Sequence, residues 1–319
     1  SMRKIVLQRI DAVDIEKFPK GWSLIGFWAQ EELLYLALTP NSRRRYELMK
    51  QKTEDNTLIS EMFIKADHVR IEPLNTALQG LIQYKITLQN RPPSMQHVFN
   101  RWENYVYLAL NAYQYPFIRT TGNTNDEWLY LGPFRDRFAL ADALDAVCKI
   151  LRLPRCETGD WPCYRLEEGS CAGWCRSLNE EETNEEYSLD KLDALLKESF
   201  LKPSDGVLEL LIQEKDKYFN DLEFVKADLL SDEIEIQAKY RDWLQFLYVA
   251  RQLSWEDELV QVQNGRLIKV KTKERDYNFL PDNTIYRDNE RLALNLMDVD
   301  EARILYDHWM SQHQGKKNV

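Results

Sequence analysis

Residues 21–51 read GWSLIGFWAQEELLYLALTPNSRRRYELMKQ. Two apolar runs, rich in leucine and aromatic residues, flank the polar AQEE at 29–32, which predicts two strands joined by a turn. The stretch 42–51 has a helical pattern. Asn41 or Ser42 suits its N-cap, because each side chain can accept a hydrogen bond from an N–H group of the first turn. We therefore expect this hairpin and helix to form the centre of a small α/β domain.

The neighbouring regions extend this pattern. Residues 4–10 have strand character, and the segment 68–89 is expected to be helical after Pro73, a residue that suits a first helical turn. A new series of three strands and one helix is predicted at 102–112, 115–123, 127–134 and 136–153. Cys148 falls on the apolar stripe of that helix, so we expect a small buried residue and not a ligand.

The second half of the chain is largely helical. Residues 188–250 carry a helical periodicity that is long for one helix, so a helical hairpin is expected. The dipeptide Asn264-Gly265 lies between two alternating runs and predicts a β-hairpin, and 299–312 predicts a final helix. The fold class is therefore α/β (α+β). Its expected parts are a small mixed-sheet domain, a cysteine-rich middle segment, the helical hairpin and a small α/β tail, at 1–97, 98–184, 185–250 and 251–319.

Composition limits the classes of function. The chain has 319 residues and a formal net charge of −10, which argues against tight nonspecific DNA binding but permits a local basic patch. It holds no apolar run of membrane-spanning length, so no membrane partner is expected. The N-terminus lacks a signal-peptide core, and the five cysteines are an odd count. Both features favour a reducing, cytoplasmic location over a disulfide framework.

Four of the cysteines are closely spaced, in the pattern C-x6-C-x7-C-x3-C: Cys156, Cys163, Cys171 and Cys175. Thiolates at such intervals in a loop can converge on one centre, and they suit an iron–sulfur cluster or a tetrahedral zinc ion. Pro162, Gly169 and Gly173 favour the turns that such a site needs. The alternative is a loop of reduced cysteines without a metal.

From residue 21 to about 245 the chain resembles the UvrC family of bacterial excinuclease proteins. The resemblance rests on YPFIRTT, YLGPF and PCYRLEEGSCAGWCRSLNEEE, and it implies a [4Fe–4S] cluster on the four cysteines. The segment NDLEFVKADLLSDEI at 220–234 resembles the UVR motif, which implies a UvrB-like partner bound through residues 215–245. The resemblance does not extend to the family's RNase H-like and helix–hairpin–helix domains.

The same resemblance implies a GIY-YIG-type nuclease domain at the N-terminus. LYLALTPNSRRR, at 34–45, aligns with the family's second motif, so Tyr35 and Arg45 match catalytic residues. Other functional positions differ. Leu38 stands in place of a lysine, Ser23 in place of the first tyrosine and Leu78 in place of the metal-binding glutamate. We therefore expect an impaired site. If Glu72 replaced the missing carboxylate, the site could still use Mg²⁺ or Mn²⁺.

Residual DNA binding is expected at the start of the helix, through Asn41, Arg43, Arg44 and Arg45; the alternative is an ordinary solvated helix face. The sequence thus predicts a DNA-repair-associated accessory protein that binds DNA or protein. Two alternatives stay open. One is an active metal-dependent, structure-selective endonuclease of the GIY-YIG class, and the other is an iron–sulfur or scaffold protein without a DNA role.

Overall fold

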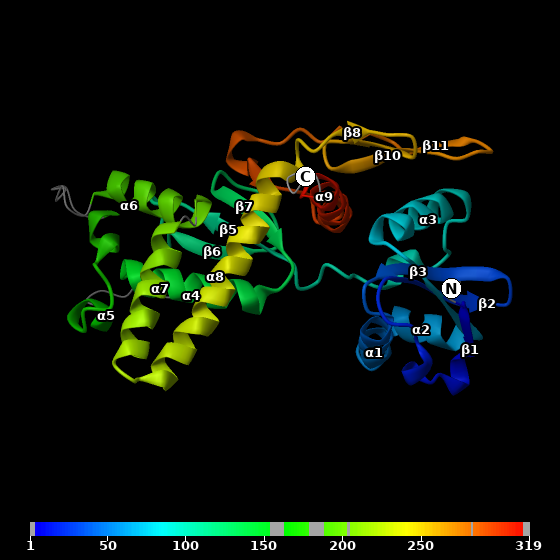
Figure 1. Ribbon diagram of the computed structural model, residues 1–319, viewed down its shortest axis with the longest axis horizontal. Helices are drawn as coiled ribbons and strands as arrows, with labels where there is room; N and C mark the ends of the chain where they lie inside the picture. Colours follow the sequence, from blue (N-terminus) through cyan, green and yellow to red (C-terminus); the bar gives the residue numbers. More distant parts are fainter. Residues whose placement is uncertain (1–3, 154–162, 179–187, 203–204, 282, 315–319) are drawn as a thin grey trace. The chain divides into compact units, whose positions relative to one another are not determined.

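The computed structural model describes residues 4–153, 163–178, 188–202, 205–281 and 283–314 (Figure 1). The chain divides into two compact units. The first consists of Ser1–Glu103, Leu253–Asp282 and Asp300–Val319, and the second of Asn104–Gln252 and Asn283–Val299. Each unit combines helices with a four-stranded sheet, and the first unit carries a further four-stranded sheet. The mixed α/β class predicted from the sequence is confirmed.

The N-terminal sheet of the first unit is antiparallel, with strand order β1-β4-β2-β3. Its strands and helices are, in chain order, β1 (Val6–Arg9), β2 (Ser23–Ala29), β3 (Glu32–Thr39), α1 (Ser42–Lys52), α2 (Thr57–Lys65), β4 (His68–Pro73) and α3 (Ala77–Asn90). The predicted hairpin at 21–39 and helix at 42–51 are confirmed. Asn41 is the N-cap of α1, and its side chain accepts a hydrogen bond from the N–H group of Arg44.

The helix expected directly after Pro73 begins later than predicted. His68–Pro73 is a strand, and α3 starts at Ala77 behind the N-cap Thr76. The residues alternate along this strand: Val69 and Ile71 are fully buried, whereas His68 and Arg70 are only partly covered. This period of two is typical of a strand. This alternation is the stronger signal here. The proline does not oppose it, because its fixed φ is also compatible with the end of a strand.

The C-terminal part of the first unit is a small antiparallel sheet with one helix. Its strands are β8 (Trp255–Glu256), β9 (Val260–Gln263), β10 (Arg266–Lys271) and β11 (Asp276–Asn278), and the helix is α9 (Val299–Gln314). Asn264 and Gly265 both have positive φ in the β9–β10 turn, so the predicted hairpin is confirmed.

The partly buried pair Lys85–Glu301, at 2.6 Å, joins α3 to α9 within the first unit. The other carboxylate oxygen of Glu301 accepts a hydrogen bond from the N–H group of Leu267. Because each oxygen of this carboxylate has its own partner, the charge is satisfied although water is largely excluded. One side chain thus ties together α3, α9 and the β9–β10 hairpin.

The second unit is built on a sheet of order β12-β7-β5-β6, in which β12 runs parallel to β7. Its elements are β5 (Val106–Leu110), β6 (Ile118–Thr121), β7 (Leu129–Phe134), α4 (Arg137–Leu151), α5 (Tyr164–Glu167), α6 (Leu189–Leu196), α7 (Asp205–Asn220), α8 (Phe224–Ala250) and β12 (Leu292–Ala293). The predicted series of three strands and a helix is confirmed, and α7 and α8 form the predicted helical hairpin. Cys148 is buried, as expected.

The long helix α8 is fixed to the rest of the second unit by buried polar contacts. Gln237 donates to the carbonyl of Ala143 at 2.8 Å, and the Tyr240 hydroxyl donates to the carbonyl of Phe200 at 2.7 Å. The ring of Tyr240 stacks on Phe134, with 5.5 Å between centroids.

In the part of the chain that the structure describes, no helix combines the length and apolar character that a membrane crossing requires.

We expect Tyr240→Phe to lower the free energy of unfolding by about 1–2 kcal/mol, because it leaves the buried carbonyl of Phe200 without its donor. Urea unfolding followed by circular dichroism checks this value. Tyr248→Phe is the matched control: it lies on the same helix but is half exposed, so its loss should stay below about 0.5 kcal/mol. Equal losses in the two variants would contradict the assignment.

Candidate functional site

Tyr35 and Arg45, the two predicted catalytic residues, lie together in the first unit. Tyr35 on β3 is buried, and its ring meets the rings of Phe27 and Phe99 edge-on. The charge of Arg45 on α1 acts on the Tyr35 side chain, and its guanidinium lies 5.6 Å from the centre of the Phe99 ring. Burial raises the pKa of Tyr35, and the charge of Arg45 opposes this shift only in part. The phenol is therefore a neutral hydrogen-bond donor.

Further cations lie near this pair. Arg101 acts electrostatically on Tyr35, and the ammonium group of Lys52 lies 5.5 Å from the centre of the same Phe99 ring. We call Arg45, Lys52 and Arg101 the basic cluster. Lys52 pairs with Glu103 and Arg101 with Asp300, whereas Nη1 of Arg45 is buried without a hydrogen-bond partner among the described residues. Arg45 as a whole is partly exposed, so the cluster presents positive charge at the surface, although this nitrogen is itself covered.

Sequence reasoning missed Arg101 and Lys52, because neither belongs to a motif. Lys52 lies at the end of α1, on the same helix as Arg45. A spacing of seven residues places two side chains on one helix face, so this cation could have been inferred from the helix alone. Arg101 lies outside any helix or strand, and no sequence signal locates it.

The residues that stand in place of family catalytic groups are apolar or small, and they are buried. Leu38 on β3 and Leu78 on α3 are both less than a tenth exposed, and Ser23 is fully buried. A Cβ atom placed on Gly80 would lie 2.6 Å from Leu38 and 2.5 Å from Leu74. Leucine side chains therefore pack directly on α3, the helix on which Leu78 lies.

Glu72, the substitute carboxylate considered above, lies on the wrong face of the sheet. Glu72 pairs with Leu24, which pairs with Leu38, whereas Tyr35 pairs with Phe27. These two rows are three residues apart along β2, and side chains alternate between the faces of a sheet. Glu72 and Tyr35 therefore point to opposite faces.

The residues predicted to contact DNA at the start of α1 differ in availability. Arg43 is committed to Glu16, through an ion pair of 3.2 Å and a hydrogen bond of 2.8 Å to its carbonyl. Asn41 is occupied as the N-cap. Arg44 is exposed, and the side chain of Arg45 turns toward Tyr35. Of the four predicted residues, Arg44 and Arg45 are thus best placed for a phosphate.

Three of the four predicted ligand cysteines lie in the described chain, whereas Cys156 falls outside it. Cys163 precedes α5, Cys171 is buried, and Cys175 is half-buried in a 3-10 segment. The Sγ atom of Cys171 accepts a hydrogen bond from the N–H group of Gly173 at 3.2 Å. Gly169 and Gly173 both have positive φ, which fits the turns expected from these glycines in the sequence.

The cysteine loop is fixed to the end of α4. The N–H group of Ala172 donates to the carbonyl of Arg152, and Nε of Arg152 donates to the carbonyl of Gly169, each at 2.9 Å. Within the described residues, no three His, Cys, Asp or Glu side chains are arranged as a metal site. The donors themselves, thiols with an N–H···S bond, have the chemistry that iron or zinc requires.

The connection between α7 and α8 exposes apolar side chains. Leu222 has a φ of 61° in the turn, and the rings of Phe219 and Phe224 meet at 5.4 Å between centroids. We call the exposed apolar residues of this region the hairpin tip: Phe219, Leu222, Phe224, Val225 and Leu229. Its residues all fall within the predicted partner segment, 215–245.

Comparison with known proteins matches a described family to part of the second unit. The family described as "UvrC/Cho excinuclease, middle domain" matches residues 105–197, which begin at β5. This chain is a distant relative of UvrC. It is 23% identical over 240 residues to the UvrABC system protein C of Dictyoglomus thermophilum, covering 70% of this chain and 37% of the relative.

Two further relatives carry the same name. The protein of Neisseria gonorrhoeae is 25% identical, with 67% of this chain and 33% of the relative covered. That of Fervidobacterium nodosum is 22% identical, with 74% and 39% covered. The matched region thus spans between a third and two fifths of the length of these proteins. No solved structure matches the chain significantly.

We expect the alkylation of Cys175 in the metal-free, reduced protein to follow a pKa above that of an ordinary thiol. Burial raises the pKa of Cys175 most, and the neighbouring Cys171 and Cys163 raise it further. The thiol therefore stays protonated, and slow to react, at neutral pH. The rate of iodoacetamide labelling against pH, read by peptide mass spectrometry, measures this midpoint.

Cys171→Ser is the control for the cause of this shift. It removes one neighbouring thiol, so the midpoint should fall only partly, because burial is the larger cause. A midpoint for Cys175 at or below that of free cysteine would contradict the assignment.

Proposed function

We propose that this chain is a DNA-repair-associated accessory protein of UvrC type, which binds DNA or a protein partner and does not cut DNA. The observation that supports the proposal is that Leu78 on α3, the residue aligned with the metal-binding glutamate, is apolar and buried. GIY-YIG chemistry needs a metal ion close to the reacting phosphate. Leu78 cannot supply the carboxylate ligand that such a metal ion requires, and the similarity to UvrC supplies the repair context. A cytoplasmic location is part of this proposal.

What remains of the site supports phosphate binding without hydrolysis. The partly exposed Arg45 and the exposed Arg44 supply positive charge at the start of α1, next to the buried Tyr35. An arginine can bind phosphate oxygens through charge-assisted hydrogen bonds whether or not a metal is present. Because Glu72 faces away, it cannot help these donors to activate water through a metal.

We expect no Mg²⁺- or Mn²⁺-dependent cleavage of nicked, branched or damaged DNA by the full chain. DNA binding at low salt, measured by fluorescence anisotropy, should weaken about tenfold in Arg45→Ala, because a charge-assisted hydrogen bond to phosphate is lost. Lys239→Ala removes an exposed cation of α8 and should change binding less than about twofold.

Two results would change this conclusion. Metal-dependent cleavage that Arg45→Ala abolishes would establish the active endonuclease. No binding to any DNA at low salt would instead favour the scaffold alternative, because phosphate contacts are strongest under that condition.

The cysteine loop is the second part of the proposal. We infer that Cys163, Cys171 and Cys175, together with Cys156, hold a [4Fe–4S] cluster or a zinc ion. Either would supply a structural clamp on the end of α4, and a cluster would also supply redox sensitivity. The alkylation experiment tests this on protein purified without oxygen, because ligation protects these thiols. Iron, zinc and sulfide contents then identify the group.

The hairpin tip supports a protein partner. Exposed apolar residues on a helical surface are typical of an interaction site, and the UVR-like sequence of α8 makes a UvrB-like protein the partner of choice. Because the tip side chains are largely exposed, they can be changed without unfolding the second unit.

We expect Val225→Asp to weaken the binding of a UvrB protein at least about tenfold, because a charge would enter an apolar contact. Calorimetry measures the affinity. Lys226→Ala, at the next position on the same helix, is the matched control and should change it less than about threefold. Equal binding by Val225→Asp and the unchanged protein would exclude the tip as the contact.

A further inference from the structure

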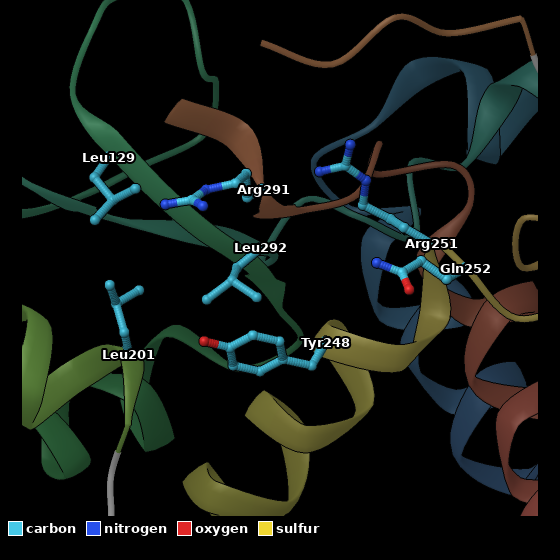
Figure 2. A pocket seen from close by; sticks show the side chains of 7 residues that line it. All are labelled: Leu129, Leu201, Tyr248, Arg251, Gln252, Arg291 and Leu292. Carbon is cyan, nitrogen blue, oxygen red and sulfur yellow. The ribbon is translucent and has the colours of Figure 1, made fainter. Parts of the chain in front are cut away.

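The second unit contains two adjoining hollows that no motif and no family match assigns. The first has a volume of about 410 Å³ and is lined by Leu129, Leu201, Leu292, Tyr248, Arg251 and Arg291, among others (Figure 2). The second, of about 460 Å³, shares Leu129, Leu201 and Arg291 with the first. Together we call them the trough. Each hollow is within the size range of small-molecule sites.

Arg291 lies where the two hollows meet. Figure 2 shows its guanidinium extended toward Leu129, while the hydroxyl of Tyr248 points into the same space. Arg291 is exposed and makes no ion pair or hydrogen bond in the part of the chain that the structure describes. An arginine held between apolar side chains without a carboxylate favours an anionic ligand.

The charges around the trough leave a positive excess. Lys197 pairs with Asp193 at 2.8 Å, whereas Glu127 and Glu290 share Arg287, at 3.3 and 3.2 Å. Arg251 has no carboxylate partner among the described residues: it lies 3.9 Å from the centre of the Tyr286 ring and donates to the carbonyl of Glu290. Arg251 and Arg291 are thus two cations without a carboxylate partner, and the lining carries one more cation than carboxylates.

Each hollow also holds one half-exposed tyrosine. Tyr248 lines the first, and Tyr113 lines the second, with its hydroxyl fixed by a hydrogen bond of 2.8 Å to Asp190. Leucine side chains line both hollows. Such a combination suits planar, weakly polar groups, because a base can lie against a tyrosine ring or an aliphatic surface.

We propose that the trough binds a dinucleotide step of single-stranded DNA, with the linking phosphate on Arg291 and one base in each hollow. A dinucleotide step has an anionic phosphate between two flat bases. The trough has Arg291 between two hollows, each lined by leucines and a tyrosine. A duplex cannot supply them, because its bases are stacked and paired. The inference rests on the proposed role in DNA repair, and it adds the strandedness of the DNA and a second site.

The trough is not a property of the matched family domain alone. Tyr248, Arg251, Arg291 and Leu292 all lie outside residues 105–197. Arg291 and Leu292 come from the segment that adds β12 to the sheet beside β7. The parts of the chain after the matched domain therefore supply Arg251 and Arg291, and the matched domain supplies Leu129 and most of the second hollow.

The test is fluorescence anisotropy of the full chain with a labelled oligothymidine of about 12 nucleotides, at low salt. Arg291→Ala should weaken binding about tenfold and lower the slope of affinity against salt by about one ion. Tyr248→Ala should weaken it about fivefold or more, whereas Tyr248→Phe, which keeps the ring, should not. Lys239→Ala is again the matched control, since it removes an exposed cation of α8 that pairs with Glu235.

Several outcomes would overturn the assignment. Equal effects of Arg291→Ala and Lys239→Ala would show that Arg291 contributes only as one of many surface charges. A blunt duplex bound as tightly as the oligothymidine would exclude strand selectivity, and thymidine monophosphate bound equally well would make the site one for a free nucleotide. If Arg45→Ala weakens DNA binding and Arg291→Ala does not, the trough fails and the proposed function stands. A complete lack of DNA binding by the unchanged protein would remove both DNA sites.

Discussion

The register of the β2–β3 hairpin is the constraint on which the first unit depends. It pairs Tyr35 with Phe27 and Leu38 with Leu24, and β4 continues both rows. Because these two rows face opposite sides, the pairing places Tyr35 toward α1 and the leucines toward α3. A shift of one residue would exchange the two sets and turn Phe27 away from Tyr46, on whose ring it stacks. The same register therefore places Tyr35 and Glu72 on opposite faces of the sheet.

The second unit depends on a long-range contact of another kind. β12 joins β7 in parallel, where Leu292 pairs with Leu131 from a distant part of the chain. Asn289 donates to the carbonyls of Asp126 and Trp128, and Tyr107 donates to the carbonyl of Leu294. These bonds satisfy backbone groups that the edge of the sheet would otherwise leave open. A domain with the UvrC middle-domain pattern is thus completed by a distant segment.

Local sequence signals predicted the elements well, and their failures have physical causes. The turn at Asn264-Gly265, the cap at Asn41 and the stripe that buries Cys148 each depend on neighbours a few residues away. The strand 68–73 was missed because Pro73 was given more weight than the alternation of Val69 and Ile71. Arg101 and Arg291 could not be found, because their importance arises only where distant segments meet. Aligned motifs located Tyr35 and Arg45, but not the sheet face on which Glu72 would lie.

The path of the chain through the two units limits how either unit could be inherited without the other. The polypeptide passes from one compact unit to the other four times, after residues 103, 252, 282 and 299. Neither unit is a continuous stretch that recombination could move alone. A stop codon anywhere between β11 and β12 would damage both units, by removing a strand from one and a helix from the other. Selection on either unit therefore preserves the segments that complete both, and the two units must evolve as one gene.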